Sequence, residues 1–278
     1  MVFKVDKQSA GQRLDIFCVG KMLQYSRASI QKAIKAGHIS VNSQAVKPRQ
    51  TLKVGDNVQV NFDTPAPSPE TPAALPALPI LYEDKHIKVI NKPAGVDAEH
   101  IPGRSHRLDK DTTGVLITAK SPDVLQSVQA QFKNRRVKKE YLALVFGRPG
   151  GQDGRINQPL TRSKNNPMRR AVARDRETIL QAKPAVTEWR MEKAVGEKLT
   201  LLRVFPLTGR THQIRVHLHW LGFPVVGDKL YTFKRQKPPP GVTRQLLHAE
   251  KLTLTLPSGK RKTFTAPLPD DFTAAINQ

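Results

Sequence analysis

The sequence predicts an α+β protein in which a small α/β unit precedes a larger domain with a mixed, largely antiparallel sheet. Residues 1–62 contain two short amphipathic helix patterns followed by alternating strand patterns. From residue 80 onward, many short strand patterns are interrupted by few helices, which is typical of an α+β domain. Six prolines within residues 63–79 predict an extended, semi-rigid linker between the two parts.

The N-terminal unit is predicted to begin with two helices. Apolar residues spaced three and four apart within residues 12–22 indicate the first. Ser26 is a candidate N-cap for a second helix that starts at Arg27, and Gly37 is suited to end it. Alternating strand patterns follow over residues 38–42 and 57–62.

The charge balance indicates a polyanionic partner. The 278-residue chain carries 46 Lys and Arg against 23 Asp and Glu, a formal net charge of +23. Nucleic acid or an acidic membrane surface is therefore the expected partner. No apolar run approaches the roughly 20 residues that span a bilayer, and the polar N-terminus lacks the apolar core of a signal peptide. We expect a cytoplasmic protein with no membrane partner and no obligate protein partner.

The basic residues are already in excess in the N-terminal unit. Residues 1–62 hold ten Lys and Arg against three Asp and Glu. Arg27, Lys32 and Lys35 fall outside the apolar face of the second helix, where they are expected to contact nucleic acid phosphates. A small basic domain with solvated charges is the alternative interpretation.

The second part begins with strand patterns at residues 87–91, 115–119 and 137–146. Ser121 and Pro122 form a cap and first-turn pair that predicts a helix. Further strands are predicted around residues 189–191 and 199–205. Thr211 is a candidate cap for a helix ended by Gly222, and residues 248–256 and 262–266 read as a hairpin.

Two basic segments lie in this second part. One follows the Ser121 helix and comprises Lys133, Arg135, Arg136, Lys138 and Lys139. The other, residues 161–176, holds six Lys and Arg against one acid and reads as a loop. Such segments are usually only solvated, but two of them in one domain favour a surface that faces nucleic acid.

Cysteine and histidine content argues against a metal site. Cys18 is the only cysteine, which excludes an internal disulfide and a cysteine-based zinc site. It lies in the first helix pattern and is expected to be a small core residue. His212, His217 and His219 have no acidic or cysteine partner at metal spacing. We therefore expect no metal and no cofactor.

Three motifs carry a resemblance to a known family. They are His106-Arg107-Leu108-Asp109-Lys110-Asp111-Thr112-Thr113-Gly114, residues 138–145 (KKEYLALV) and residues 207–218 (LTGRTHQIRVHL). A shorter stretch, Asn-Lys-Pro-Ala-Gly, precedes them and ends at Gly95. In this order they resemble the motifs of the RluA-type pseudouridine synthases, which isomerise uridine within folded RNA. The N-terminal unit resembles the S4-type RNA-binding domain. The resemblance implies an S4-type domain over 1–62, the linker over 63–79 and a pseudouridine synthase domain over 80–278.

The resemblance also implies roles for individual residues. Asp109 is the catalytic carboxylate, which either attacks the sugar or abstracts a proton from it, and Arg215 is its ion partner. Tyr141 packs against the target base, and Arg107 enters the RNA stack that the flipped uridine has left. Ile214 and Val216 supply apolar lining, with a plain core role as the alternative. The basic segments, rather than the motifs, predict RNA contacts at Arg27, Lys32, Lys35, Arg135, Arg136 and Lys138.

Several alternatives stay open at this stage. Without the resemblance, Tyr141 would be read as a half-buried strand aromatic and Arg215 as a surface helix charge. Only residues 96–105 separate Gly95 from His106, a shorter segment than the family usually carries, which motivates a non-catalytic RNA-binding or ribosome-assembly factor. A glycosidase would need paired carboxylates, whereas Asp111 should face away from Asp109. Large-subunit ribosomal RNA is the expected substrate, with transfer RNA as the alternative.

Overall fold

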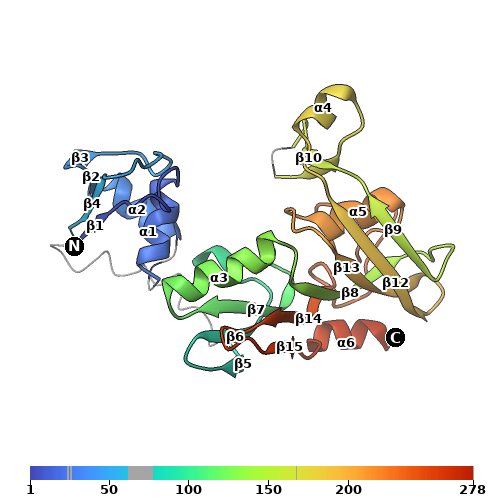
Figure 1. Cartoon of the computed structure of the whole chain (residues 1–278). Coiled ribbons are helices and arrows are strands. Elements are labelled where there is room, and N and C mark those ends of the chain that lie inside the picture. The colour runs from blue at the N-terminus through green and yellow to red at the C-terminus, as the bar shows by residue number, and fades with distance from the viewer. Residues whose placement is uncertain (24, 26, 62–77, 167, 278) are drawn as a thin grey trace.

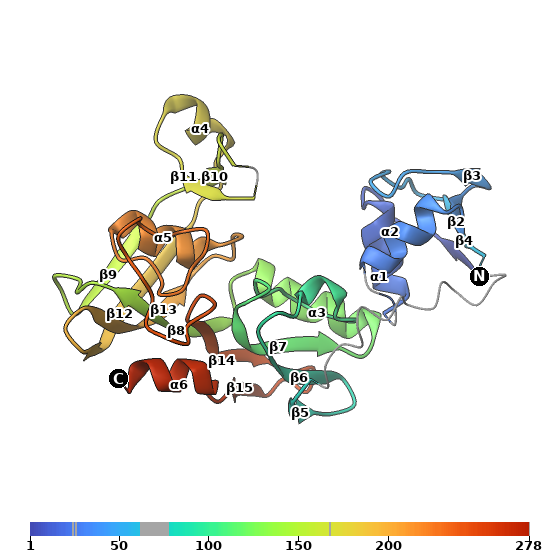
Figure 2. The same cartoon turned by 180° about the vertical axis from the view of Figure 1, so that it is seen from behind.

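The computed structural model describes residues 1–23, 25, 27–61, 78–166 and 168–277. The buried hydrophobic clusters of these residues fall into two groups. One cluster is built from residues between 5 and 60, and the buried members of the others all lie beyond residue 86. Figure 1 and the reverse view in Figure 2 show the N-terminal part at one end of the molecule, beside helix α3 (Pro122–Lys133). The predicted linker lies outside the described residues except for residues 78 and 79.

Two helices pack on a small antiparallel sheet at the N-terminus. They are α1 (Leu14–Lys21) and α2 (Arg27–Lys35). The sheet order is β1-β4-β2-β3, with β1 (Val2–Lys4), β2 (Ile39–Val41), β3 (Gln44–Ala45) and β4 (Asn57–Val60). The predicted helices and strands of this unit are thus confirmed. Cys18 is fully buried in the core as expected, while the predicted cap Ser26 lies outside the described residues.

A buried carboxylate joins the two N-terminal helices. The Asp15 side chain is 0% exposed. It accepts hydrogen bonds from Arg13 (2.7 Å), Arg27 (2.8 Å) and the Gln31 amide (2.6 Å). The Arg27 guanidinium is therefore committed to an internal ion pair, because a buried carboxylate needs such partners. Of the predicted RNA contacts on α2, Lys32 and Lys35 are the exposed ones.

A nine-stranded sheet forms the second part. Its order is β5-β6-β7-β14-β8-β13-β12-β9, with β15 also paired to β14. Every pairing is antiparallel except that of β7 with β14, so the predicted mixed, largely antiparallel sheet is confirmed. The strands are β5 (Ile80–Glu83), β6 (Ile87–Lys92), β7 (Thr113–Ala119), β8 (Lys138–Phe146), β9 (Asp153–Asn157), β12 (Val186–Val195), β13 (Leu199–Pro206), β14 (Leu247–Thr255) and β15 (Arg261–Thr265).

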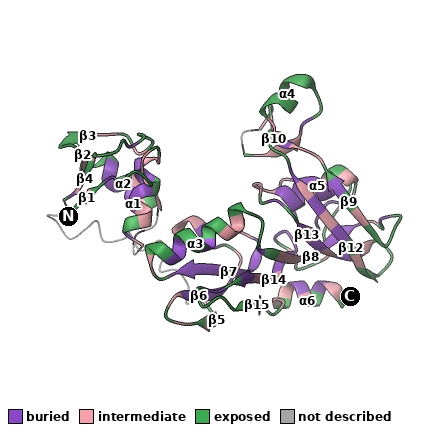
Figure 3. Cartoon of the chain, viewed as in Figure 1, coloured by how far each residue is buried: buried purple, intermediate pink, exposed green. Residues whose placement is uncertain are grey.

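The alternation of β8 decides which of its side chains face the site. Ala143 and Val145 pack in a cluster with α5 (Gln213–Leu221). Leu142 and Leu144 pack with α6 (Asp270–Ile276) on the opposite face. Successive strand residues point to opposite faces, so Tyr141 shares the face that α5 covers. Figure 3 shows the central strands buried between these helices.

Helices and turns complete the second part, with two corrections. Ser121 caps α3 by accepting a hydrogen bond from the Val124 amide, as predicted, and Gly222 ends α5 in a left-handed conformation. Thr211 is not the cap of α5, because the N-cap is His212, without a side-chain cap bond. Residues 161–176 are not simply a loop: they contain most of a hairpin, β10 (Leu160–Arg162) and β11 (Arg170–Val172), followed by the start of α4 (Arg176–Gln181).

The segment 96–105 forms a compact connection to the first motif. It contains the short helix η1 (Ala98–His100), whose N-cap Asp97 accepts from the Glu99 amide at 2.8 Å. Ala98 and Ile101 are buried. Helix α2 contacts η1, and α1 contacts α3. The shortened segment is therefore an ordered part of the fold that meets the N-terminal helices.

Gly114 closes the first motif where two strands approach closely. Its φ is +115°, and an added Cβ would clash with the carbonyl of Ala249 on β14. The parallel pair β7–β14 is in register here, Gly114 opposite Ala249. Only glycine fits this combination of conformation and contact, which fixes the exit of the motif loop beside β14.

Candidate active site

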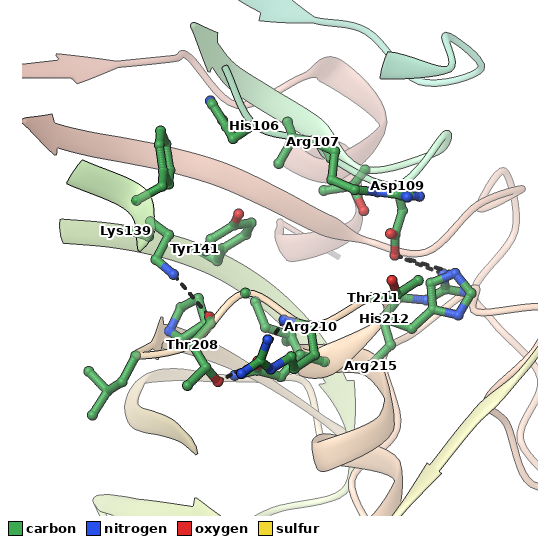
Figure 4. A pocket seen from close by; sticks show the side chains of 18 of the residues that line it. His106, Arg107, Asp109, Lys139, Tyr141, Thr208, Arg210, Thr211, His212 and Arg215 are labelled. Atoms are coloured by element: carbon green, nitrogen blue, oxygen red, sulfur yellow. Dashed lines mark hydrogen bonds and ion pairs between the residues drawn. The ribbon is translucent and has the colours of Figure 1, made fainter. Parts of the chain in front are cut away.

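A pocket of about 550 Å³ opens between three segments of the second part. Its walls come from the motif loop 105–112, the start of β8 and the loop 206–212 that leads into α5, with the end of α3 at the rim. Figure 4 shows side chains from these segments converging on the space, including Asp109, Tyr141, His212 and Arg215. Its volume lies within the ordinary range of small-molecule and cofactor pockets.

A buried ammonium group, that of Lys92, anchors the motif loop 105–112. Lys92, 0% exposed, donates hydrogen bonds to the carbonyls of Pro93 (2.9 Å), Val96 (2.9 Å) and Lys110 (2.8 Å). Burial lowers the Lys92 pKa to about 8, against the opposing influence of nearby carboxylates. The ammonium ties the turn after β6 to the residue that follows Asp109, so it restrains the position of that carboxylate.

Asp109 and Asp228 share one arginine. Arg215 donates to Asp228 through Nε (2.6 Å) and Nη2 (2.9 Å), and to Asp109 through Nη1 (3.0 Å). The side chains are 5% exposed for Arg215, 0% for Asp228 and 16% for Asp109. The bidentate pair with Asp228 fixes the plane of the guanidinium. The remaining edge of Arg215 then faces Asp109, the only carboxylate among the described residues that line the pocket.

Tyr141 supplies an aromatic wall on the β8 side. Burial, together with the charge of Asp109, raises the pKa of its phenol. Tyr141 therefore keeps its proton at neutral pH. It contacts both the α5 cluster and the cluster that contains Leu108, so its ring bridges the motif loop and α5.

The loop before α5 is fixed by the side-chain amide of Gln213. Its oxygen accepts from the Thr208 hydroxyl (2.6 Å) and the Arg210 amide (3.0 Å), and its nitrogen donates to the Val186 carbonyl (2.9 Å). Lys139 donates to the Thr208 carbonyl at 2.9 Å, and burial lowers its pKa to about 8. These contacts give the loop a defined shape and leave its basic side chains at the pocket.

His106 is a structural acceptor rather than a free base. Its Nε2 accepts the Ile117 amide at 3.1 Å, and its ring stacks on Phe132 with the centroids 4.6 Å apart. Burial, helped by the positive charges of Lys139 and Arg104, lowers its pKa to about 3. The imidazole is thus neutral and anchors the motif loop to β7.

This burial predicts an acid-sensitive contribution to stability. The unfolded imidazole has a pKa near 6.5 and the folded one near 3, so between these values the unfolded state binds more protons. The contribution is present above pH 6.5 and is lost as the pH falls. In urea unfolding at pH 7 and pH 5, His106→Gln should lose less stability than the wild type on acidification. Parallel losses in both proteins would contradict this role.

Most predicted site residues meet at the pocket, but not all. Asp109, Tyr141, Arg215, Arg107 and Ile214 line it. Arg107 is half exposed and pairs with Glu99 at 3.3 Å. Val216 is not a lining residue, because it lies on another face of α5 and packs with Leu160, Ala185 and Tyr231. Of the predicted RNA contacts near the site, Arg135 reaches the rim, whereas Arg136 and Lys138 are exposed outside it.

Sequence reasoning missed Asp228, Lys92 and Lys139 as site residues. Asp228 lies 13 positions after Arg215, and its carboxylate also accepts the amides of Leu230 and Tyr231. The only signal was a Gly-Asp pair after the buried run at Val225 and Val226. That pair resembles an ordinary turn, so its role emerges only from the fold.

Comparison with known proteins agrees with the motifs. The family model for RNA pseudouridylate synthase matches residues 86–220, and the model for the S4 domain matches residues 12–58. An uncharacterized RNA pseudouridine synthase of Chloroflexus aurantiacus is 36% identical, with the match covering 100% of this chain and 93% of the relative. The chain belongs to the RNA pseudouridine synthases.

Two further pseudouridine synthase relatives extend the agreement. Ribosomal large subunit pseudouridine synthase D of Nitrosomonas europaea is 36% identical over 96% of this chain and 84% of its own length. The solved structure of human RNA pseudouridylate synthase domain containing 4 superimposes with a TM-score of 0.61 at 27% identity, covering 72% of this chain and 92% of that one. The chain is therefore an S4 domain followed by the pseudouridine synthase fold, and an isomerase.

The described residues contain neither a membrane-spanning helix nor a metal-binding cluster. No helix there is long and apolar enough to cross a membrane. No group of three or more His, Cys, Asp or Glu side chains there is arranged to hold a metal ion. In particular, His217 is occupied by Thr187 (2.8 Å) and the Gln158 carbonyl (3.0 Å), which leaves it no free nitrogen for a metal.

Proposed function

We propose that this pseudouridine synthase isomerises uridines of large-subunit ribosomal RNA in the cytoplasm. The observation that carries the catalytic part is Asp109, the one carboxylate that lines the pocket within the described part of the chain, held at 3.0 Å from a buried arginine. The name of the Nitrosomonas relative supports the ribosomal substrate, and the S4-domain match over residues 12–58 supports a structured RNA. Transfer RNA is the second candidate.

The proposed chemistry needs Asp109 as a carboxylate anion at a partly buried position. Isomerisation breaks the N-glycosidic bond, turns the uracil and rejoins it through C5, without a net redox change. Asp109 either attacks the sugar or removes a proton from it, and both routes require the anion. A cation within hydrogen-bond distance pairs with such an anion and fixes its position. Arg215 supplies that cation, and Asp228 keeps it in place.

The remaining pocket residues fit a flipped nucleotide. The reacting faces of sugar and base are inaccessible within a base stack, so the uridine has to leave it. In the proposal Tyr141 packs against the uracil, and its protonated phenol stands near C5. Arg107, half exposed at the rim, occupies the place in the stack that the uridine vacates. Ile214 contributes apolar lining.

The basic surfaces are proposed to hold the RNA around this pocket. Residues 1–62 would act as the RNA-binding domain, joined through the linker 63–79 to the catalytic domain 80–278. Lys32 and Lys35 on α2 contribute there, and Arg135, Arg136 and Lys138 contribute beside the pocket. Arg27 contributes less than its charge suggests, because Asp15 already binds it.

The function is tested by tritium release from RNA labelled at C5 of uridine. Ribosomal and transfer RNA from cells that lack the enzyme serve as separate substrates. Tritium release from ribosomal RNA is expected, because the new carbon–carbon bond at C5 of uracil replaces the bond to tritium. Release from transfer RNA alone would replace the ribosomal assignment. No release from either, despite salt-sensitive binding, would overturn the enzymatic proposal for these RNAs.

Salt dependence tests the contribution of α2. Each phosphate contact releases condensed counterions, so log K falls with log salt by roughly 0.7 to 0.9 per contact. Lys35→Gln should weaken binding and reduce that slope by about one contact. Arg148→Gln is the matched control, because Arg148 lies beyond the far end of β8, where it donates to the Gly196 carbonyl. An unchanged slope in Lys35→Gln would remove Lys35 from the interface.

A further inference from the structure

The proposed chemistry assigns no role to His212, a pocket side chain next to Asp109. This residue has φ +57°, a left-handed conformation that is uncommon outside glycine. It stands at the N-cap of α5 but makes no side-chain cap bond. Non-glycine residues in such conformations cluster at functional sites. Rather than capping the helix, the imidazole of His212 lies in the pocket beside Asp109 (Figure 4).

One imidazole nitrogen is fixed by Tyr231. Nδ1 lies 3.0 Å from the Tyr231 hydroxyl oxygen, and that oxygen accepts the Arg170 amide at 2.7 Å. Tyr231 is 2% exposed, and its hydroxyl has no other hydrogen-bond acceptor among the described residues. A buried hydroxyl rarely leaves its proton unpaired. The Tyr231 proton therefore goes to Nδ1, and the neutral imidazole carries its own proton on Nε2.

The other nitrogen faces the catalytic carboxylate across a gap. Nε2 lies 3.9 Å from Asp109 Oδ2, which is too long for a hydrogen bond. Among the described residues it has no acceptor within hydrogen-bond distance. Burial, partly opposed by the charge of Asp109, lowers the His212 pKa, so the ring is neutral at pH 7. A fixed N–H donor without an acceptor thus points into the pocket next to Asp109.

We propose that His212 donates a hydrogen bond from Nε2 to the 2′-hydroxyl of the target uridine. This inference rests on the proposed function. Asp109 has to reach C1′ or C2′ of the sugar by either chemical route. The polar atom bonded to C2′ is the 2′-oxygen. A donor 3.9 Å from the carboxylate can reach that oxygen when C1′ or C2′ lies against Asp109. Because the 2′-hydroxyl distinguishes RNA from DNA, His212 would help to select a ribonucleotide.

Two amide variants separate donation from backbone conformation. His212→Gln places a side-chain N–H near the position of Nε2, whereas the shorter amide of His212→Asn ends near Nδ1. Asn tolerates the left-handed backbone better than Gln, so a purely conformational role predicts the better activity for Asn. Donation predicts the reverse: Asn should lower the single-turnover rate by about tenfold relative to wild type, and Gln should retain more of it.

A thermodynamic cycle with the substrate identifies the acceptor. Oligonucleotides spanning the mapped target carry either uridine or 2′-deoxyuridine at that position. Equilibrium binding is measured with Asp109→Asn, which holds the substrate without turnover, and with Asp109→Asn combined with His212→Asn. The deoxy substitution should weaken binding about three- to tenfold with His212 present and by less than twofold without it, since coupling appears only between contacting groups.

The outcomes keep this inference apart from the proposed function. Tritium release by the wild type decides the function independently of His212. Equal losses from the deoxy substitution in both backgrounds would show that His212 does not contact the 2′-hydroxyl, and would overturn the inference alone. Higher activity in His212→Asn than in His212→Gln would also overturn it. Thermal unfolding of both variants verifies that they remain folded.

Discussion

Asp109→Asn is expected to abolish pseudouridine formation while leaving RNA binding nearly intact. Asn has the shape of Asp, and its amide oxygen can still accept the Arg215 Nη1 hydrogen bond seen at 3.0 Å. It can neither attack the sugar as an anion nor act as a base at that site. The loss should be at least about 10⁴-fold, as for removal of a group essential to the chemical step. Single-turnover tritium release and equilibrium RNA binding measure the two effects.

Asp111→Asn is the matched control for this variant. Asp111 belongs to the same motif and carries the same charge, but it does not line the pocket. Its backbone carbonyl accepts from Arg244 at 3.2 Å, which the substitution preserves. Turnover should therefore stay within about threefold of wild type, as for substitutions outside structural and functional contacts. Substantial turnover by Asp109→Asn would remove Asp109 from catalysis, and equal losses in both variants would attribute the effect to the general charge of the loop.

Local patterns predicted the elements that position the site. The strand pattern over residues 137–146 predicted β8, and the period of two in any strand places Tyr141 on the face of Ala143 and Val145. Ser121 and Pro122 predicted the start of α3. Such signals depend on residues that are neighbours in sequence. They are sufficient to predict a site residue where its position within one helix or strand determines which way its side chain points.

Other parts of the site depend on contacts between distant segments. Lys92 directly follows the predicted strand at residues 87–91, in a turn sequence that gives no hint of burial, yet it donates a hydrogen bond to the Lys110 carbonyl. Asp228 reads as a turn residue until Arg215 is placed beside it. The resemblance implied apolar lining for both Ile214 and Val216, but residues two apart on a helix face different directions. Val216 instead takes the core role that was its alternative. The motif at residues 207–218 predicted which segment contributes to the pocket, whereas the geometry of α5 determines which of its side chains face the pocket.

The hairpin β10–β11 was missed for a different reason. Its basic, Asn- and Pro-containing sequence is typical of a loop. Its strands are three residues each and are joined across Leu160 and Val172. The Tyr231 hydroxyl, provided by a distant segment, accepts the Arg170 amide. A tertiary contact thus supports strands too short for a sequence pattern to reveal.

Arg215→Ala is expected to cost both stability and turnover, because two carboxylates would lose their shared cation. The Asp228 side chain is 0% exposed, and an unpaired buried charge typically costs about 3–5 kcal/mol. The loss of the ion partner of Asp109 should independently reduce turnover. Urea unfolding and single-turnover kinetics below the unfolding transition measure the two losses separately. A fully stable and active Arg215→Ala protein would contradict both roles.

Arg215→Lys and a double variant distinguish these two losses. Lysine keeps the charge but cannot bind Asp228 bidentately while also reaching Asp109, so the protein should fold with turnover reduced by about 100-fold or more. Combining Arg215→Ala with Asp228→Ala removes the buried charge together with its partner, and much of the lost stability should return. Turnover should not return, since Asp109 still lacks a cation. If the double variant regained turnover, the arginine would serve only to pair with Asp228, and catalysis by Asp109 would not require an arginine partner.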